Sequence, residues 1–191
     1  MSLLGHVAIG VATARRITPA GQQAEVLPVR MMVLAAFALL PDVDFLLHAL
    51  SPSVDFLEHR GATHSLVFAL SIGLVVAVAL RVSAQSLPVQ WGIVTALVVA
   101  SHALLDAFGH TTLGVELLWP FSDARYLAPL DVLPNPGPQD LLLRRGLADL
   151  GLEFLIFLPF WVYAFFPRHA RPLHGGHTTG SGSATADPRD D

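Results

Sequence analysis

The sequence predicts an all-α membrane protein built as a multi-pass bundle of about four to five membrane helices. Three observations support this prediction. Apolar residues make up 53% of the 191-residue chain and charged residues only 14%, whereas soluble domains contain about 25% charged residues. Several stretches are apolar over about 20 residues, the length that an α-helix needs to cross a bilayer. The ionisable residues inside these stretches fall into short groups.

Four long apolar stretches and one short one are the predicted helices. Residues 65–82 are free of charged residues until their last turn, and their rise of 1.5 Å per residue gives about 27 Å. A buried helix of a soluble protein is the alternative for this stretch. Residues 3–14 predict either a short, tilted span or a helix wedged into the bundle. The other long stretches are residues 31–50, which Pro41 interrupts, residues 87–109 and residues 147–166.

The remaining segments define the expected domain organisation. Residues 1–167 are predicted to form one integral-membrane domain, in which residues 18–28 are a loop. Residues 121–146 contain four prolines and predict a long extramembrane loop. Residues 168–191 are rich in Gly, Ser, Thr and Asp, which predicts a disordered tail.

Charge and cysteine content exclude several classes of function. The formal net charge of -4 argues against a nucleic-acid partner, which would require a basic face. The chain has no cysteine, so disulfides, thiolate metal sites and a cysteine nucleophile are excluded. Any metal ion would therefore be held by nitrogen and oxygen atoms.

The ionisable residues within the apolar stretches need counter-charges. A carboxylate near the centre of a bilayer costs at least about 2.5 kcal/mol. Arg60 is the only arginine within the groups, so a bound cation is the simplest counter-charge for the aspartates. The groups are His6, then Asp42 and Asp44, then His59 and His64, and finally His102 and Asp106.

Spacing within the groups supports shared coordination. His102 and Asp106 are four residues apart and project from one face of a helix. Asp42 and Asp44 are two apart, so they can converge only if the backbone near Pro41 is irregular, or else each serves a different partner. His59 and His64 are expected where a loop enters the next helix, which Thr63 or Ser65 can cap.

Threading the chain through the membrane brings the groups to one end of the bundle. If the first helix enters from one side, the second returns with Asp42 and Asp44 towards that side. The third helix begins there after His59 and His64, and the fourth climbs back with His102 and Asp106. The full predicted fold class is therefore an all-α transmembrane bundle with a metal site at one end.

Each group also has an ordinary structural explanation. His6 can be an interfacial histidine, and Asp42 with Asp44 can form a helix-capping turn. His59 and His64 can be loop residues. His102 with Asp106 can be a buried hydrogen-bonded pair, and Glu58 can be a solvated loop charge.

At these motifs the chain resembles the YdjM-like bacterial family of membrane-bound, metal-dependent hydrolases, described as LexA-binding and associated with the inner membrane. The matching pieces are GHVAIG around His6, LLPDVDF at residues 39–45, HRGATHS at residues 59–65, SHALLDAFG at residues 101–109 and LLWPFS at residues 117–122. The series of His and Asp residues is also distantly similar to that of zinc-dependent phospholipases C. The resemblance implies a hydrolase in the bacterial inner membrane, and an association with a LexA-type regulator is expected from the resemblance alone.

Seven side chains are candidate ligands for one or two divalent ions: His6, Asp42, Asp44, His59, His64, His102 and Asp106. Imidazole with carboxylate suits zinc, with manganese or iron as alternatives. The candidate general base is Glu58, or Asp44 or Asp42, whichever of these two is not a metal ligand, and Arg60 is expected to hold a phosphate. Because the site lies at the end of a membrane bundle, a small or lipid-linked phosphoester is the expected substrate. Two alternatives are a non-catalytic protein with a structural ion or ion-pair cluster, and a metal or proton carrier.

The arginines indicate the orientation of the site. Arg15, Arg16, Arg30 and Arg81 are expected at the end opposite the His and Asp groups. The positive-inside rule then places the site on the outer face, although Arg144 and Arg145 are expected on the face of the site.

Overall fold

The structure is a computed structural model that describes residues 3–45, 59–109, 113–130, 133–134 and 143–166. Six α-helices have both ends within these residues, and the same residues contain no β-strand, only two isolated bridges. The predicted all-α fold class is therefore confirmed. Glu58 and residues 168–191, for which the sequence predicts a general base and a disordered tail, lie outside the described residues.

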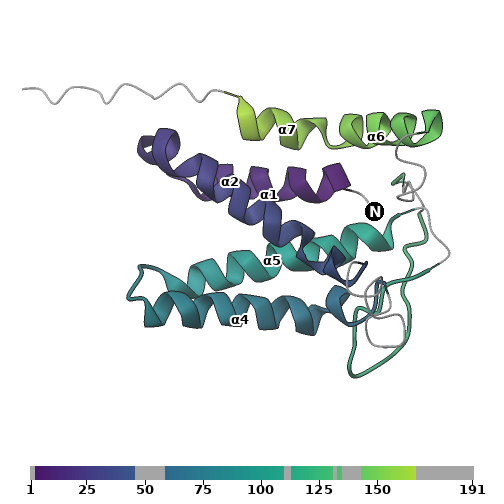
Figure 1. Cartoon of the computed structure of the whole chain (residues 1–191), viewed down its shortest axis with the longest axis horizontal. Helices are drawn as coiled ribbons and strands as arrows, with labels where there is room; N and C mark the ends of the chain where they lie inside the picture. The colour runs from purple at the N-terminus through teal and green to yellow at the C-terminus, as the bar shows by residue number, and fades with distance from the viewer. Residues whose placement is uncertain (1–2, 46–58, 110–112, 131–132, 135–142, 167–191) are drawn as a thin grey trace, which may run out of the picture.

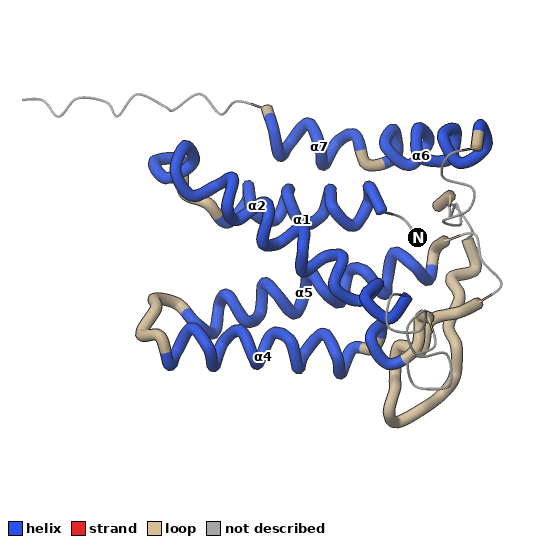
Figure 2. The backbone as a smooth tube through the Cα atoms, in the orientation of Figure 1, coloured by secondary structure: helices blue, strands red, loops and turns tan. Residues whose placement is uncertain are grey.

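The helices are arranged in three layers (Figure 1). Helices α1 (Leu3–Ile17) and α2 (Gln23–Leu39) form the middle layer. The hairpin of α4 (Leu66–Val82) and α5 (Pro88–Ala107) packs on one side, while α6 (Arg144–Ile156) and α7 (Leu158–Phe165) pack against α1 on the other. Figure 2 shows that the long loop segments gather at one end of the bundle, opposite the short turn between α4 and α5.

Helix α1 is a central element of the bundle. It contacts α2, α5, α6 and α7 and buries eight of its fifteen residues. Gly10 permits the close contact with α2, because a Cβ atom there would lie 2.7 Å from the carbonyl oxygen of Leu34. Of the two alternatives for this segment, these contacts favour the helix wedged into the bundle.

The structure contains helices that can cross a membrane. Ala20–Phe45 and Pro88–Ala107 are long and apolar enough, and α6 with α7 adds a third if the bent pair counts as one span. Helix α4 is equally apolar but has only 17 residues. Leu70, Leu74 and Val75 on α4 are exposed although they are apolar, as is expected of a surface that faces lipid.

The two helices of the hairpin follow the sequence prediction closely. The side chain of Ser65 caps α4 by accepting a hydrogen bond from the backbone N–H of Phe68 at 3.0 Å. Pro88 lies in the first turn of α5, where its missing N–H has no helical partner to lose. Gly73 and Gly92 let the helices touch, because a Cβ atom on Gly73 would lie 2.5 Å from the carbonyl oxygen of Gly92.

The predicted loop at residues 18–28 is wrong from residue 23 onwards. A 3₁₀ turn covers Ala20–Gln22, and α2 begins at Gln23 with Pro28 inside it. Proline removes one helical hydrogen bond and weighs against a helix. Here Leu27 and Leu34 are buried in a cluster with Ala14 of α1, and this packing outweighs the loss.

The predicted continuous helix over residues 147–166 is also wrong. Helix α6 ends at Ile156 and α7 begins at Leu158, with a bend of 61° between them. Pro159 cannot donate to the carbonyl of residue 155, so the chain restarts as a new helix with this proline in its first turn. Hydropathy alone does not reveal this break, because proline interrupts the hydrogen bonding and not the apolar pattern.

Candidate metal centre

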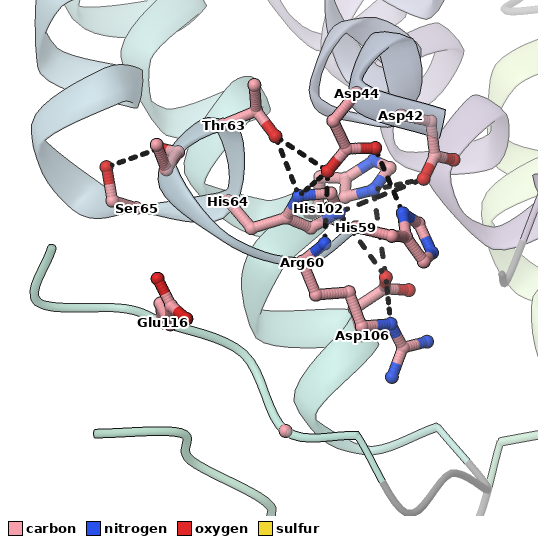
Figure 3. Close-up of polar contacts among 12 residues, drawn as sticks. Asp42, Asp44, His59, Arg60, Thr63, His64, Ser65, His102, Asp106 and Glu116 are labelled. Atoms are coloured by element: carbon pink, nitrogen blue, oxygen red, sulfur yellow. Dashed lines mark hydrogen bonds and ion pairs between the residues drawn. The ribbon is translucent and has the colours of Figure 1, made fainter. Parts of the chain in front are cut away.

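The predicted His and Asp groups meet at one end of the bundle (Figure 3). They come from four elements: His6 from α1, Asp42 from the 3₁₀ turn Leu40–Asp42, His64 from the 3₁₀ turn Ala62–His64, and both His102 and Asp106 from α5. The convergence inferred from threading the chain is present in the structure.

Pro41 produces the local geometry that the two neighbouring aspartates need. Helix α2 stops at Leu39, and the tighter 3₁₀ turn that follows changes the direction in which the next side chains point. Asp42 faces His64 and His102, whereas Asp44 faces His59 and Thr63 (Figure 3). The two aspartates therefore meet at His64, Asp42 on its Nε2 side and Asp44 on its Nδ1 side, and their other partners differ.

Four ligand atoms face a common point. The Nε2 atom of His102 lies 3.4 Å from Oδ1 of Asp42 and 3.9 Å from Oδ2 of Asp106. The Nε2 atom of His64 lies 3.8 Å and 3.6 Å from the same two oxygen atoms. All four atoms lie within 4.8 Å of one another and could hold a metal ion.

These separations suit a metal ion better than direct hydrogen bonding. None of the four atoms has a hydrogen-bond partner, although all are buried. A charge-assisted hydrogen bond between imidazolium and carboxylate would bring nitrogen and oxygen to about 2.7–2.9 Å. Ligands about 2.0–2.1 Å from a tetrahedral ion would lie about 3.4 Å apart. The donor set of two imidazoles and two carboxylates fits zinc, manganese or iron.

The other nitrogen of each imidazole is held by a hydrogen bond. The Nδ1 atom of His102 lies 2.6 Å from the carbonyl oxygen of Ala38, which can only accept. The Nδ1 atom of His64 lies 3.1 Å from Oδ2 of Asp44. Both arrangements place a proton on Nδ1 and leave the Nε2 lone pair directed at the common point, as in most histidine ligands.

Asp44 is held by hydrogen bonds on both of its oxygen atoms. Its Oδ1 lies 2.9 Å from Nδ1 of His59. Its Oδ2 accepts from the backbone N–H of Arg60 at 3.0 Å and from the hydroxyl of Thr63 at 2.8 Å, and it also faces His64. Asp44, His59 and His64 form a second group that could hold an ion, but hydrogen bonds already satisfy the carboxylate.

His6 and Arg60 surround Asp106. The Nε2 atom of His6 lies 3.3 Å from Oδ1 of Asp106, and its ring stacks on that of His102 at 3.6 Å between centroids. The Nε atom of Arg60 lies 3.2 Å from Oδ2 of Asp106. Arg60 is buried and has a positive φ of 68°, so its backbone takes the left-handed turn that directs the side chain inwards.

The pKa of His64 reflects these carboxylates. His64 precedes α4 and lies outside the helices that can cross the membrane. Burial by itself lowers the pKa of this imidazole, but the carboxylates of Asp106 and Asp44 outweigh it and raise the pKa to about 9. Without a metal ion, His64 is therefore the proton-bearing counter-charge of the cluster.

Comparison with known proteins identifies the family. The family model described as YdjM inner membrane protein matches residues 1–166. The chain is also 34% identical over 146 residues to the inner membrane protein YbcI of Escherichia coli (strain K12), a match that covers 75% of this chain and 82% of YbcI. The chain belongs to the YdjM family of inner membrane proteins. No solved structure matches it.

Membership in the YdjM family confirms the resemblance stated from the motifs and the expected inner-membrane location. All seven predicted ligands lie in one cluster, but the metal-ligand and catalytic assignments stay predictions. Asp42, His64, His102 and Asp106 offer atoms to a common point. Asp44 and His59 bond to each other, and His6 lies beside Asp106.

Glu153 is a further member of this region, and it was not predicted from the sequence. It is fully buried on α6, and its Oε1 accepts a hydrogen bond of 2.6 Å from the backbone N–H of Gly5, next to His6. The carboxylate caps the first turn of α1, whose N–H groups otherwise have no helical acceptor. The available signal was an acidic residue within an apolar stretch, which usually marks an inward-facing position.

Proposed function

We propose that this YdjM-family protein is a metal-dependent hydrolase that acts on a phosphoester of a lipid-linked or otherwise amphipathic substrate. One observation carries the proposal: four buried nitrogen and oxygen atoms without hydrogen-bond partners face a common point. Buried polar atoms are rarely left without partners unless they serve a ligand or an ion. The position of the cluster at the end of a membrane bundle favours a substrate that is anchored in lipid.

The charges of the cluster balance with one divalent ion. Asp42, Asp44 and Asp106 carry three negative charges, and Arg60 supplies one positive charge against Asp106. One divalent cation neutralises the remainder if the histidines are neutral. A single ion held by Asp42, His64, His102 and Asp106 is therefore the simplest occupancy.

A divalent ion held there would supply Lewis acidity, which makes water more acidic and offsets charge that develops on a phosphoryl oxygen. Hydrolysis also requires that a water lose a proton as its oxygen bonds to phosphorus, and that the leaving oxygen gain a proton as its bond to phosphorus breaks. The second oxygen of Asp42, which is buried without a partner, can accept the first proton. Glu58 is the alternative acceptor.

Asp44 and Arg60 have supporting roles in this proposal. Asp44 is engaged by four donors, so it fixes the imidazole of His64 instead of accepting a proton from water. Arg60 donates a hydrogen bond to the carbonyl oxygen of Leu113 and pairs with Asp106. Its main role in this proposal is therefore to balance the charge of Asp106, not to hold a phosphate. The more exposed members of the cluster are His59, at 24%, and Asp42, at 9%. The substrate would therefore approach from their side.

Metal analysis of detergent-purified protein, followed by a screen of phosphomonoesters, phosphodiesters and phospholipids, tests the proposal. We expect about one equivalent of zinc, manganese or iron and metal-dependent release of phosphate or of a headgroup. The variants His102→Ala and Asp106→Ala should lose both metal and activity. Asp123→Asn, which changes an exposed loop carboxylate, is the matched control and should keep both. Full metal occupancy in the double variant His102→Ala/Asp106→Ala would refute the ligand assignment.

A structural ion is the second candidate function, and the burial of the cluster favours it. His64 and His102 are fully buried and Asp106 is 1% exposed, and structural metal sites are closed to solvent. In that case chelation would unfold the protein, and no phosphoester would be turned over under any metal condition. Loss of activity without unfolding on chelation would instead support the hydrolase.

A further inference from the structure

The end of the bundle opposite the cluster contains two hollows that meet at Arg30. One, of about 480 Å³, lies between α2 and the α4–α5 hairpin. The other, of about 300 Å³, lies between the start of α2 and the start of α5. Both are lined by Arg30, Ser86 and Trp91. The larger hollow continues between apolar side chains, including Val33 and Phe37 of α2 and Val76 and Leu80 of α4.

Arg30 is an arginine within a helix that can cross the membrane. Its guanidinium lies 4.9 Å from the centroid of the Trp91 ring. It reaches back towards the end of α1, where its hydrogen bonds to the Ile17 carbonyl and the Thr18 hydroxyl are long, at 3.5 and 3.3 Å. Within the described residues, no carboxylate forms an ion pair with it. A permanently charged group within a membrane-spanning helix is costly unless an anion accompanies it.

We propose that an anionic phospholipid occupies these hollows, with its phosphate on Arg30 and an acyl chain between α2 and α4. A guanidinium binds phosphate through paired hydrogen bonds, and Ser86 and Gln85 line the same hollow and can add donors. Trp91 beside them is the residue type found at the level of lipid headgroups. The apolar walls formed by Val33 and Leu80 suit a hydrocarbon chain.

The charge at this end of the bundle matches an anionic headgroup. Arg15 and Arg16 lie in the last turn of α1. Glu25, in the first turn of α2, is the one acidic side chain among the described residues of these helix ends. Basic residues at a membrane surface attract anionic lipids.

This lipid is distinct from the proposed substrate. Arg30 precedes Asp42 by twelve residues and Trp91 precedes His102 by eleven, so the two sites lie about 17 Å apart along the helices. A phosphate on Arg30 cannot reach the metal centre. The bound lipid would instead hold α2, which leads to Asp42, against the hairpin that carries His102, and it would do so whether or not the cluster is catalytic.

Fluorescence of Trp91 tests the proposal directly. In a Trp119→Phe/Trp161→Phe background Trp91 is the only tryptophan, and phospholipids with brominated acyl chains quench it on contact. We expect quenching at a several-fold lower mole fraction of phosphatidylglycerol than of phosphatidylcholine. Arg30→Gln should abolish this preference, while Arg81→Gln, which changes an exposed arginine at the same end, should retain it. Equal quenching by the two lipids, or a preference that survives Arg30→Gln, would overturn the proposal.

Native mass spectrometry of the full chain provides a measurement that does not depend on the tryptophan replacements. Protein released from micelles doped with phosphatidylglycerol should retain one lipid molecule, and Arg30→Gln should retain several-fold less while Arg81→Gln retains as much. Inorganic phosphate added in excess should not displace the lipid. Displacement by phosphate alone, or equal retention by Arg30→Gln, would contradict a lipid site.

Discussion

At the scale of single residues, the cluster is organised by its hydrogen bonds. The carbonyl of Ala38 and the carboxylate of Asp44 each fix the tautomer of one histidine, so that the Nε2 atoms of His102 and His64 stay available. Sequence spacing alone placed Asp42 and Asp44 on equal terms. Only the turn at Pro41 shows that one faces the common point while the other supports it.

The variant Asp44→Asn tests the positioning role of this carboxylate. The amide keeps its shape but loses its charge, and only one of its two terminal atoms can still accept hydrogen bonds. We expect the affinity for zinc or manganese to fall about 10–100-fold, because partners of metal ligands usually contribute that much. Competition titration against a fluorescent chelator measures the effect. Thr63→Val removes only one hydrogen-bond donor to Oδ2 of Asp44 and should lower the metal affinity less. Unchanged metal affinity in Asp44→Asn would rule out the positioning role.

The raised pKa of His64 predicts opposite pH responses with and without metal. A histidine whose pKa rises from 6.5 to about 9 on folding adds stability that is complete below about pH 6.5 and lost as the pH passes 9. The melting temperature of chelated protein should therefore fall between pH 6.5 and 9. Metal must displace this proton, so the apparent affinity should rise up to about tenfold per pH unit over the same range.

The variant His64→Gln provides the control for this pH dependence. It lacks the titrating group, so the melting temperature of its chelated form should change less between pH 6.5 and 9. A slope equal to that of the wild-type protein would assign the pH dependence to another group.

At the scale of elements, the close crossing of α4 and α5 sets the separation between His64 and His102. A Cβ atom on Gly73 would lie 2.7 Å from the Cβ of Ala96, and one on Gly92 would lie 2.7 Å from the Cβ of Ala77. Helix packing of this kind requires small residues at the contact. We therefore expect the glycines to influence the candidate metal site, although they lie more than two helical turns from it.

Alanine scanning of three helical glycines tests this connection. Gly73→Ala and Gly92→Ala should lower the melting temperature and weaken metal binding, because the helices must move apart. Gly151→Ala on α6 meets nothing within 4 Å. It should be neutral or stabilising by up to about 1 kcal/mol, which is the intrinsic preference of a helix for alanine. If all three variants behaved alike, the crossing would not control the site. Thermal unfolding and chelator competition in the same detergent provide both measurements.

The elements also show what sequence can and cannot reveal. Helices α4 and α5 were predicted almost to their ends, because the apolar pattern, together with Ser65 at the start of α4, indicates these boundaries. The break before α7 and the early start of α2 were not predicted. In both cases a proline stands in an apolar stretch, and its effect depends on tertiary packing: Pro28 is accommodated within α2, and Pro159 starts a new helix.

At the scale of the whole molecule, the meeting of the His and Asp groups was predictable because antiparallel threading returns alternate helix ends to one side. The directions of the individual side chains were not predictable. They depend on the positive φ of Arg60, on the turn at Pro41 and on the capping of α1 by Glu153, which joins residues 148 positions apart. Topology therefore follows from the apolar pattern, whereas the fine geometry of the site follows from contacts distant in sequence.

The orientation of the whole bundle leads to the last prediction. Arg15, Arg16, Arg30 and Arg81 mark the end opposite the cluster, while at the cluster end Arg60 pairs with Asp106. By the positive-inside rule we expect the arginine-rich end to face the cytoplasm and the cluster to face outwards.

Labelling of single introduced cysteines tests this orientation. The chain contains no native cysteine, so no other side chain of the protein contributes a thiol signal. Ser83→Cys places a thiol after the last turn of α4, at the arginine-rich end, and Ala124→Cys places one in the loop at the cluster end; both positions are exposed. In intact spheroplasts a membrane-impermeant maleimide should modify Ala124→Cys at once and Ser83→Cys only after permeabilisation. The reverse pattern would place the cluster in the cytoplasm, where Arg144 and Arg145 at the start of α6 would then satisfy the same rule. An outward site would restrict the substrate to molecules presented at the outer surface of the inner membrane.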